Sequence, residues 1–143
     1  MQHIAPSNAA RASSVLRPGL LALAGLQFVT GAWMVVAPGA FYTVIADFGP
    51  RNEHDLRDMA AFYLSSAIVL AVAAQRPSWR APALALVGLQ FGFHALNHLA
   101  DIANADPSWV GPFDLVTLAA ATVLIGALYR TADREDQQRG RRA

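Results

Sequence analysis

Four apolar segments, each close to the length of a membrane-spanning helix, limit what this chain can fold into. They cover residues 18–38, 58–75, 81–100 and 112–129. A helix needs about 20 apolar residues to cross the hydrocarbon core of a bilayer. Charged residues make up 15% of the 143 residues, against about 25% in an ordinary soluble domain. The sequence therefore predicts an all-α protein, a four-transmembrane-helix bundle.

Arginine is concentrated in the segments that would face the cytoplasm. Arg76 and Arg80 lie between the second and third apolar segments, and a cluster of arginines follows residue 129, whereas the other two loops hold only Arg51 and Arg57. The positive-inside rule then places both termini inside, an N-in/C-in topology. The predicted organisation is a cytoplasmic N-terminal tail over residues 1–17, a transmembrane domain over 18–129 and a basic cytoplasmic tail over 130–143.

An internal repeat relates the first and third segments. The stretch Leu21-Ala-Leu-Ala-Gly-Leu-Gln-Phe28 recurs as Leu84-Ala-Leu-Val-Gly-Leu-Gln-Phe91. Both segments would run outward, so the chain is predicted to form two tandem helical hairpins, a parallel internal repeat with Gln27 and Gln90 at equal depth. Because small residues and leucine are common in membrane helices, chance remains an alternative explanation of the match. The repeat also favours a retained first segment over a cleaved signal peptide, whose apolar stretch is usually about 7 to 15 residues.

One polar stripe runs along the third segment. Gln90, His94, Asn97, His98 and Asp101 recur at spacings of three and four and so share one face of a helix. Polar groups that face lipid cost roughly 2.5 to 3.5 kcal/mol or more each. The stripe is therefore predicted to face a partner or a cavity, and the equivalent positions of the first segment carry no such stripe.

Two histidines within the stripe have the spacing of metal ligands. His94 and His98 lie one turn apart, and Asp58 and Asp114 open the second and fourth segments, from which they could complete a metal centre with Asp101. Zn²⁺, Cu²⁺ or Fe²⁺ would suit imidazole and carboxylate ligands, so a divalent transition metal is one hypothesis for a cofactor. Asp58 has a competing interpretation as an acidic residue at a helix start.

Other interpretations of the stripe remain open beside the metal centre. Gln90, Asn97 and Asp101, with Ser65 of the second segment, are candidate ligand-binding residues of an outward-facing pocket, whose occupancy could depend on histidine protonation. Alternatively, the histidines are hydrogen-bonded packing residues between helices. Haem is disfavoured, because two histidines on one turn cannot ligate opposite faces of the ring.

The loop over residues 39–50 is unusually apolar for a connection. It contains Phe41, Tyr42, Val44, Ile45 and Phe48. Such a segment is expected to rest on the outer membrane interface and to cover the bundle there. We interpret it as a membrane-resting segment and not as a catalytic lid.

Composition excludes several chemistries. The absence of cysteine removes disulfides, iron–sulfur clusters, thiolate nucleophiles and c-type haem attachment. There is no Gly-rich phosphate loop, nucleophile elbow or Rossmann fingerprint. All eleven basic side chains are arginine, which suggests a GC-rich bacterial genome and hence a plasma (inner) membrane location. Nucleic-acid binding is not needed to explain these arginines.

The chain resembles small bacterial tetraspan membrane proteins of the DoxX-like group. The resemblance rests on the four segments, on Asp58-Met-Ala-Ala-Phe-Tyr-Leu64 and on the pair His94 and His98, and it covers residues 18–129. Some members of that group are membrane subunits of quinone-linked oxidoreductases, and the resemblance implies a similar role as one alternative for this chain. No functional residue is transferred from that group.

These observations predict a small integral membrane protein with an outward-facing His/Asp site, acting as a ligand- or metal-binding protein or an accessory membrane subunit. The alternatives are a membrane subunit of a quinone-linked oxidoreductase and a structural interaction protein without a ligand site. Whether the chain is an enzyme is left open. The expected partners are membrane lipids and a homo-oligomer or larger membrane complex, with no nucleic acid.

Overall fold

The computed structural model describes residues 8–141, with side chains from residue 15 onward, and its regular structure there is helical. The predicted tails therefore lie partly outside the described residues, at 1–7 and 142–143. Four of the helices in the described part are long and apolar enough to cross a membrane, which confirms the predicted fold class and a multi-pass membrane protein. In chain order the elements are α1 (Asn8–Val36), α2 (Pro38–Ile45), α3 (Glu53–Gln75), η1 (Pro77–Trp79), α4 (Arg80–Ala100) and α5 (Val110–Gly140).

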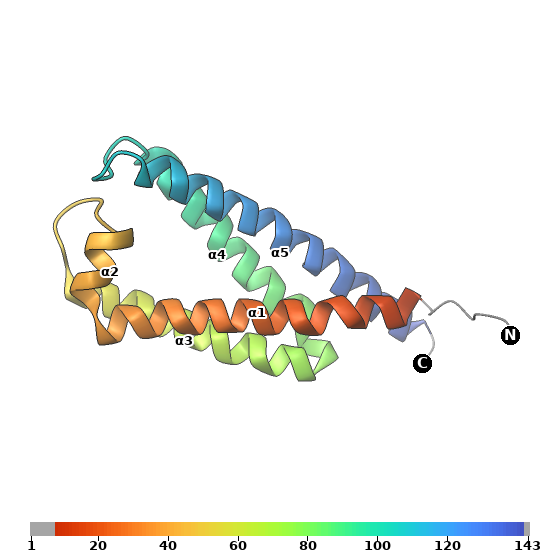
Figure 1. Cartoon of the computed structure of the whole chain (residues 1–143). Coiled ribbons are helices and arrows are strands. Elements are labelled where there is room, and N and C mark those ends of the chain that lie inside the picture. The colour runs from red at the N-terminus through yellow and green to blue at the C-terminus, as the bar shows by residue number, and fades with distance from the viewer. Residues whose placement is uncertain (1–7, 142–143) are drawn as a thin grey trace, which may run out of the picture.

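The four long helices form two hairpins. The most extensive packing is between α1 and α3 and between α4 and α5, whereas α3 with α4 and α1 with α5 touch far less. Figure 1 shows the hairpins converging where α1 begins and α5 ends, which we call the closed end. They separate at the opposite, open end, where α2 lies between them (Figure 1). The predicted tandem hairpins are confirmed, while the N-in/C-in orientation stays a prediction.

A continuous apolar core fills the closed end. Its side chains come from all four long helices, and most of them are small or unbranched at Cβ, so the helices approach closely. Leu16, Leu20, Leu70 and Leu84 are each 0% exposed. The other buried members are Ala24, Ala73, Ala74, Ala83, Val87, Phe91, Ile125 and Ala132.

The two repeats meet through their glutamines. Gln27 Nε2 of α1 donates a hydrogen bond of 3.0 Å to Gln90 Oε1 of α4. Gln27 is 0% exposed, and an amide buried without a partner would be costly in hydrocarbon. This bond places the repeat-related glutamines at one depth of the bundle, as the internal repeat predicts.

Two helices begin or end beyond the predicted boundaries. Glu53, and not residue 58, opens α3, because the Asn52 side chain accepts hydrogen bonds from the backbone N–H groups of His54 and Asp55. Helix α5 continues past residue 129 to Gly140. In that extension Glu135 is buried and accepts a 2.7 Å hydrogen bond from Arg80. The tail predicted from residue 130 is thus helical as far as it is described.

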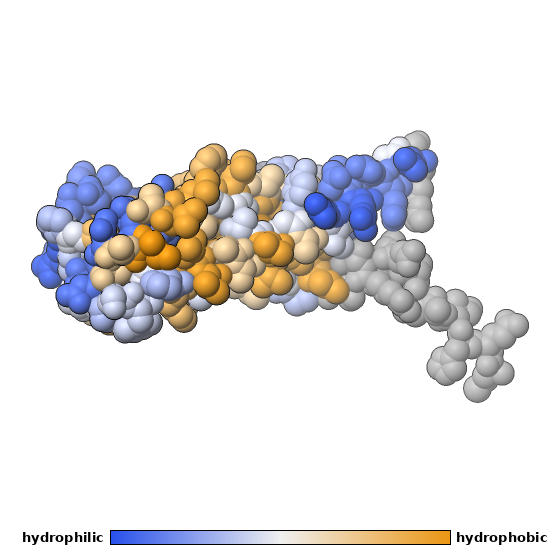
Figure 2. All heavy atoms as spheres, turned by 90° about the horizontal axis from the view of Figure 1, so that it is seen from above, coloured by the Kyte–Doolittle hydropathy of each residue, from blue (hydrophilic) through white to orange (hydrophobic). Residues whose placement is uncertain are grey.

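The outer surface of the bundle is apolar around its middle. Large side chains that point outward there include Val29, Ile68, Leu89 and Val123, which are 62%, 67%, 61% and 72% exposed. Figure 2 shows this band on one face, with hydrophilic residues at both ends. A continuous apolar area of this width would be unfavourable in water. The band is therefore the part of the surface expected to face lipid.

The apolar connection after α1 is partly a helix. Pro38 opens α2 at a position where its missing N–H costs nothing, and Phe41 is 5% exposed. The Phe41 ring packs edge-on against Trp33 at a centroid distance of 5.4 Å. The segment covers the open end, although sequence patterning predicted a loop and missed the helix, because eight residues are too few to show helical periodicity.

Hydrogen bonds hold the loops at the open end. The Tyr42 hydroxyl lies 2.8 Å from Asp47 Oδ1 and also contacts the Gly49 carbonyl oxygen. The bond to Asp47 raises the pKa of Tyr42 above its ordinary value. The backbone N–H of Asp106, in the loop before α5, donates to the Asp47 carbonyl at 3.2 Å. The loops of the two hairpins are therefore joined across the open end.

Candidate functional site

A cavity of about 600 Å³ lies between the hairpins at the open end. This size is typical of pockets for small molecules. Much of its wall is apolar and comes from α1, α2, the following loop, α3 and α5. The apolar lining residues are Met34, Phe41, Ile45, Ala46, Phe48, Leu56, Met59, Phe62, Phe93 and Leu118.

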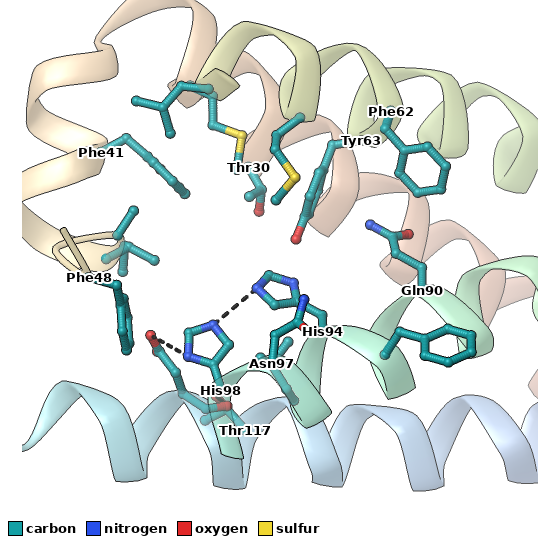
Figure 3. A pocket seen from close by; sticks show the side chains of 18 of the residues that line it. Thr30, Phe41, Phe48, Phe62, Tyr63, Gln90, His94, Asn97, His98 and Thr117 are labelled. Atoms are coloured by element: carbon teal, nitrogen blue, oxygen red, sulfur yellow. Dashed lines mark hydrogen bonds and ion pairs between the residues drawn. The ribbon is translucent and has the colours of Figure 1, made fainter. Parts of the chain in front are cut away.

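The polar stripe of α4 forms one wall of this cavity. The members of the stripe that line it are Gln90, His94, Asn97 and His98, followed by Asp101 at the end of the helix. Figure 3 shows His94 and His98 pointing from α4 towards the far wall. Gln90, His94 and His98 are partly buried in a hollow between helices, which lowers the cost of placing them in hydrocarbon, whereas Asn97 is exposed at its edge.

A hydrogen bond joins the imidazole rings of His94 and His98. Their Nε2 atoms lie 3.0 Å apart, and the rings stack at a centroid distance of 4.8 Å with an interplanar angle of 30°. Two protons or two lone pairs cannot face each other in such a bond, so one Nε2 donates and the other accepts. The neutral pair therefore has two possible proton orders: either His94 donates to His98, or His98 donates to His94.

Asp114 of α5 favours one of the two orders. Its Oδ2 lies 4.0 Å from His98 Nδ1, and both side chains are nearly buried, at 13% for His98 and 11% for Asp114. A proton on Nδ1 of His98 complements the carboxylate and leaves Nε2 of the neutral ring to accept from His94. The His98 ring is also fixed by Phe48, edge-on at 4.7 Å (Figure 3).

The opposite wall contributes polar groups that sequence reasoning missed. Thr30 of α1 and Tyr63 of α3 line the cavity across from His94 (Figure 3). Thr117 of α5 also lines it, but its hydroxyl already bonds the carbonyl oxygens of Phe113 and Asp114. A hydroxyl within an otherwise apolar span was the available signal for Thr30 and Tyr63.

Two of the predicted site residues lie outside the cavity. Asp58 is 73% exposed on its side chain, and its Oδ2 lies 3.6 Å from His54 Nε2. Ser65 is exposed as well. The cavity side of α3 carries Leu56, Met59, Phe62 and Tyr63, and at 100° per residue Asp58 and Ser65 lie on another face of the helix. The structure brings Asp114 to His98 and does not bring Asp58 there.

The histidine pair alone has the geometry of two metal ligands. Imidazole nitrogens bound to one ion at about 2.0–2.1 Å would lie near the 3.0 Å that separates the two Nε2 atoms. Among residues 8–141, however, no group of three or more His, Asp or Glu side chains is placed to hold a metal ion. Protein zinc sites use at least three protein ligands, so the described residues supply an incomplete set.

Comparison with models of protein families, with curated proteins and with solved structures found no match. The fold and the site therefore carry the functional argument. They define a small helical membrane protein in which two hairpins enclose a cavity with one polar wall.

Proposed function

We propose that this protein binds a small, largely apolar molecule in the cavity at the open end and recognises its polar group through His94 and His98. One observation carries the proposal. The polar stripe of α4 faces a cavity of about 600 Å³ whose other walls are mainly apolar. That combination of apolar walls and a few convergent polar groups is typical of small-molecule sites.

The proton order of the histidines supports a binding role. With Nδ1–H of His98 directed at Asp114 and Nε2–H of His94 directed at His98, the neutral pair leaves Nδ1 of His94 as an acceptor. A ligand that donates a hydrogen bond would satisfy it. Because the site lies among apolar side chains, water competes less for that bond than it would on the surface.

The experiment measures binding of naphthol, a small aromatic alcohol, to the full chain in mild detergent. Trp33 packs on Phe41 of the cavity wall, so a bound aromatic molecule should quench tryptophan fluorescence saturably. We expect His94→Leu to weaken binding about tenfold, the factor for one lost hydrogen bond of about 1.4 kcal/mol.

The matched control is His54→Leu, because His54 is 82% exposed on its side chain and lies outside the cavity. This variant should bind naphthol as the natural chain does. Equal weakening in both variants, or quenching that never saturates, would contradict the proposal.

Metal binding is the second candidate, favoured by the 3.0 Å separation of the two Nε2 atoms. It requires a ligand beyond the described set, from water, a bound molecule or another copy of the chain. Elemental analysis of the purified chain tests it. One equivalent of metal that is lost in His98→Leu would support metal binding. Metal-free protein that still binds naphthol would exclude metal binding and support only the first proposal.

A further inference from the structure

The cavity has an edge that faces the membrane, between α3 and α4. Met59 and Phe62 of α3 and Phe93 of α4 all line the cavity, and yet they are 43%, 41% and 65% exposed. A side chain that is both in the cavity wall and on the outer surface marks an opening. We call this opening the slit, with Asn97 as its polar member nearer the open end.

The position of the slit places it in hydrocarbon. Phe62 and Phe93 lie inside membrane-length helices and not in the connecting loops. Figure 3 shows Phe62 and Gln90 at one end of the cavity, with Phe41 and Phe48 at the other. At the open end, α2 and the loop that carries Phe48 form part of the cavity wall, and exposed Asp101 also lines the cavity there. A molecule dissolved in the bilayer therefore meets the slit directly.

The charged residues of the cavity wall indicate which charge the head group of a bound ligand can carry. Among the described lining residues there is no arginine, and the chain has no lysine. Two carboxylates, Asp101 and Asp114, line the same cavity. Phosphate and carboxylate groups are usually held by arginine or lysine, so an anionic head group has no permanent positive partner here and would meet like charge.

The hydrogen-bonding groups narrow the class further. Nδ1 of His94 is an acceptor when the histidine pair is neutral, and the Asn97 amide offers both a donor and an acceptor at the cavity wall. A hydroxyl group, which donates one bond and accepts others, matches this arrangement. The apolar part of the same molecule would lie against Met59, Phe62 and Phe93.

We infer that the ligand is an amphipath with a hydroxyl head group and no anionic group, and that it enters the cavity from the bilayer through the slit between α3 and α4. This inference rests on the proposed function, because it assumes that the cavity binds a ligand. It adds the chemical class of that ligand and its route.

The test uses the full chain in phosphatidylcholine nanodiscs with hexadecanol that carries a mid-chain diazirine. After illumination, mass spectrometry locates the labelled residues. We expect labelling concentrated around Met59, Phe62 and Phe93, and we expect unlabelled hexadecanol to suppress it. Hexadecanoic acid should compete about tenfold less well, the ratio for a difference of about 1.4 kcal/mol.

Blocking the slit is the second arm. Phe93→Trp adds bulk at the edge of the slit, whereas Leu89→Trp places the same side chain at a position on α4 that is 61% exposed and outside the cavity. Labelling by the hexadecanol probe should fall about tenfold in Phe93→Trp and stay unchanged in Leu89→Trp. Circular dichroism of both variants checks that the helices are intact.

Four outcomes would overturn the inference. These are uniform labelling of all lipid-facing residues, equal competition by hexadecanoic acid, labelling centred on Thr30 and Thr117, and equal labelling of the two tryptophan variants. If naphthol binding nevertheless depends on His94, the proposed function stands and only the route and ligand class fail. If naphthol binding fails as well, the proposed function fails.

Discussion

The two ring nitrogens of His98 face different groups, and buried Nδ1 makes no hydrogen bond. Nε2 lies 3.0 Å from His94 and Nδ1 lies 4.0 Å from Asp114. A carboxylate beside one nitrogen of an imidazole sets which nitrogen carries the proton, and so decides what the other nitrogen can do. In this cavity, Asp114 is therefore a positioning residue that acts on a ligand through His98 and His94.

Replacement of Asp114 by asparagine tests that role, because it removes the charge and keeps the shape. We expect Asp114→Asn to weaken naphthol binding about fivefold, corresponding to about 1 kcal/mol for a perturbed hydrogen bond. Fluorescence titration measures the change. Asp55→Asn, an exposed position at the start of α3, is the control. Unchanged binding in Asp114→Asn would show that the carboxylate does not order the histidines.

Sequence patterning located much of the site but not its partners across the cavity. The spacing of Gln90, His94 and His98 was enough to place them on one face, because that spacing is fixed by the helix itself. The rotation of α3 about its axis is set by packing, so the sequence could not exclude Asp58 or select Tyr63. Whether the predicted residues bind a ligand or a metal stays a prediction.

Helix α1 approaches α3 closely at Gly31. A Cβ atom at this position would lie 2.9 Å from Leu64 Cγ, 3.1 Å from the Ala60 carbonyl oxygen and 3.1 Å from Tyr63 Cβ. Close approach over a small residue is a common way for membrane helices to gain packing contacts. The same approach holds Tyr63 at the cavity wall.

A matched pair of glycine substitutions tests the importance of this contact. Gly31→Ala should lower the free energy of unfolding by about 1 to 3 kcal/mol, because the added methyl group must push α3 away. Gly25→Ala meets nothing within 4 Å and should be neutral or stabilising by up to about 1 kcal/mol through helix propensity. Thermal unfolding in one detergent compares them. Equal stability of the two variants would contradict close packing at Gly31.

The long helices were easier to predict than the short one. Each long helix is apolar over about the thickness of a bilayer, which few other structures explain. Helix α2 has only eight residues between Pro38 and Ile45, and its burial depends on contacts with Met34 and Tyr63 from other elements. Such tertiary contacts are absent from any local pattern, so the segment could be predicted to cover the bundle but not to be helical.

The distribution of charge, and not the packing of the helices, is what predicts the orientation of the whole bundle in the membrane. Both described chain ends lie at the closed end (Figure 1), and the closed end carries Arg76, Arg80 and Arg130. The positive-inside rule predicts that this end faces the cytoplasm and that the cavity opens towards the outer leaflet.

Single cysteines can test the orientation cleanly, because the natural chain contains none. Ser78 of η1 and Ser108 of the loop before α5 are both exposed and lie in the connections before α4 and α5. In intact cells, a membrane-impermeant maleimide should label Ser108→Cys and not Ser78→Cys. After cell lysis both should react. The reverse pattern in intact cells would overturn the predicted topology.

The bond between Gln27 and Gln90 joins the same position of the two repeats. A contact of this kind needs no difference between the halves, and two identical hairpins could form it with each other. The cavity, in contrast, uses His94 and His98, whose equivalent positions in the first half are Gly31 and Val35. Substitutions that change which ligand binds can therefore occur at the open end of the α4–α5 hairpin alone, without altering the glutamine contact that joins the two halves.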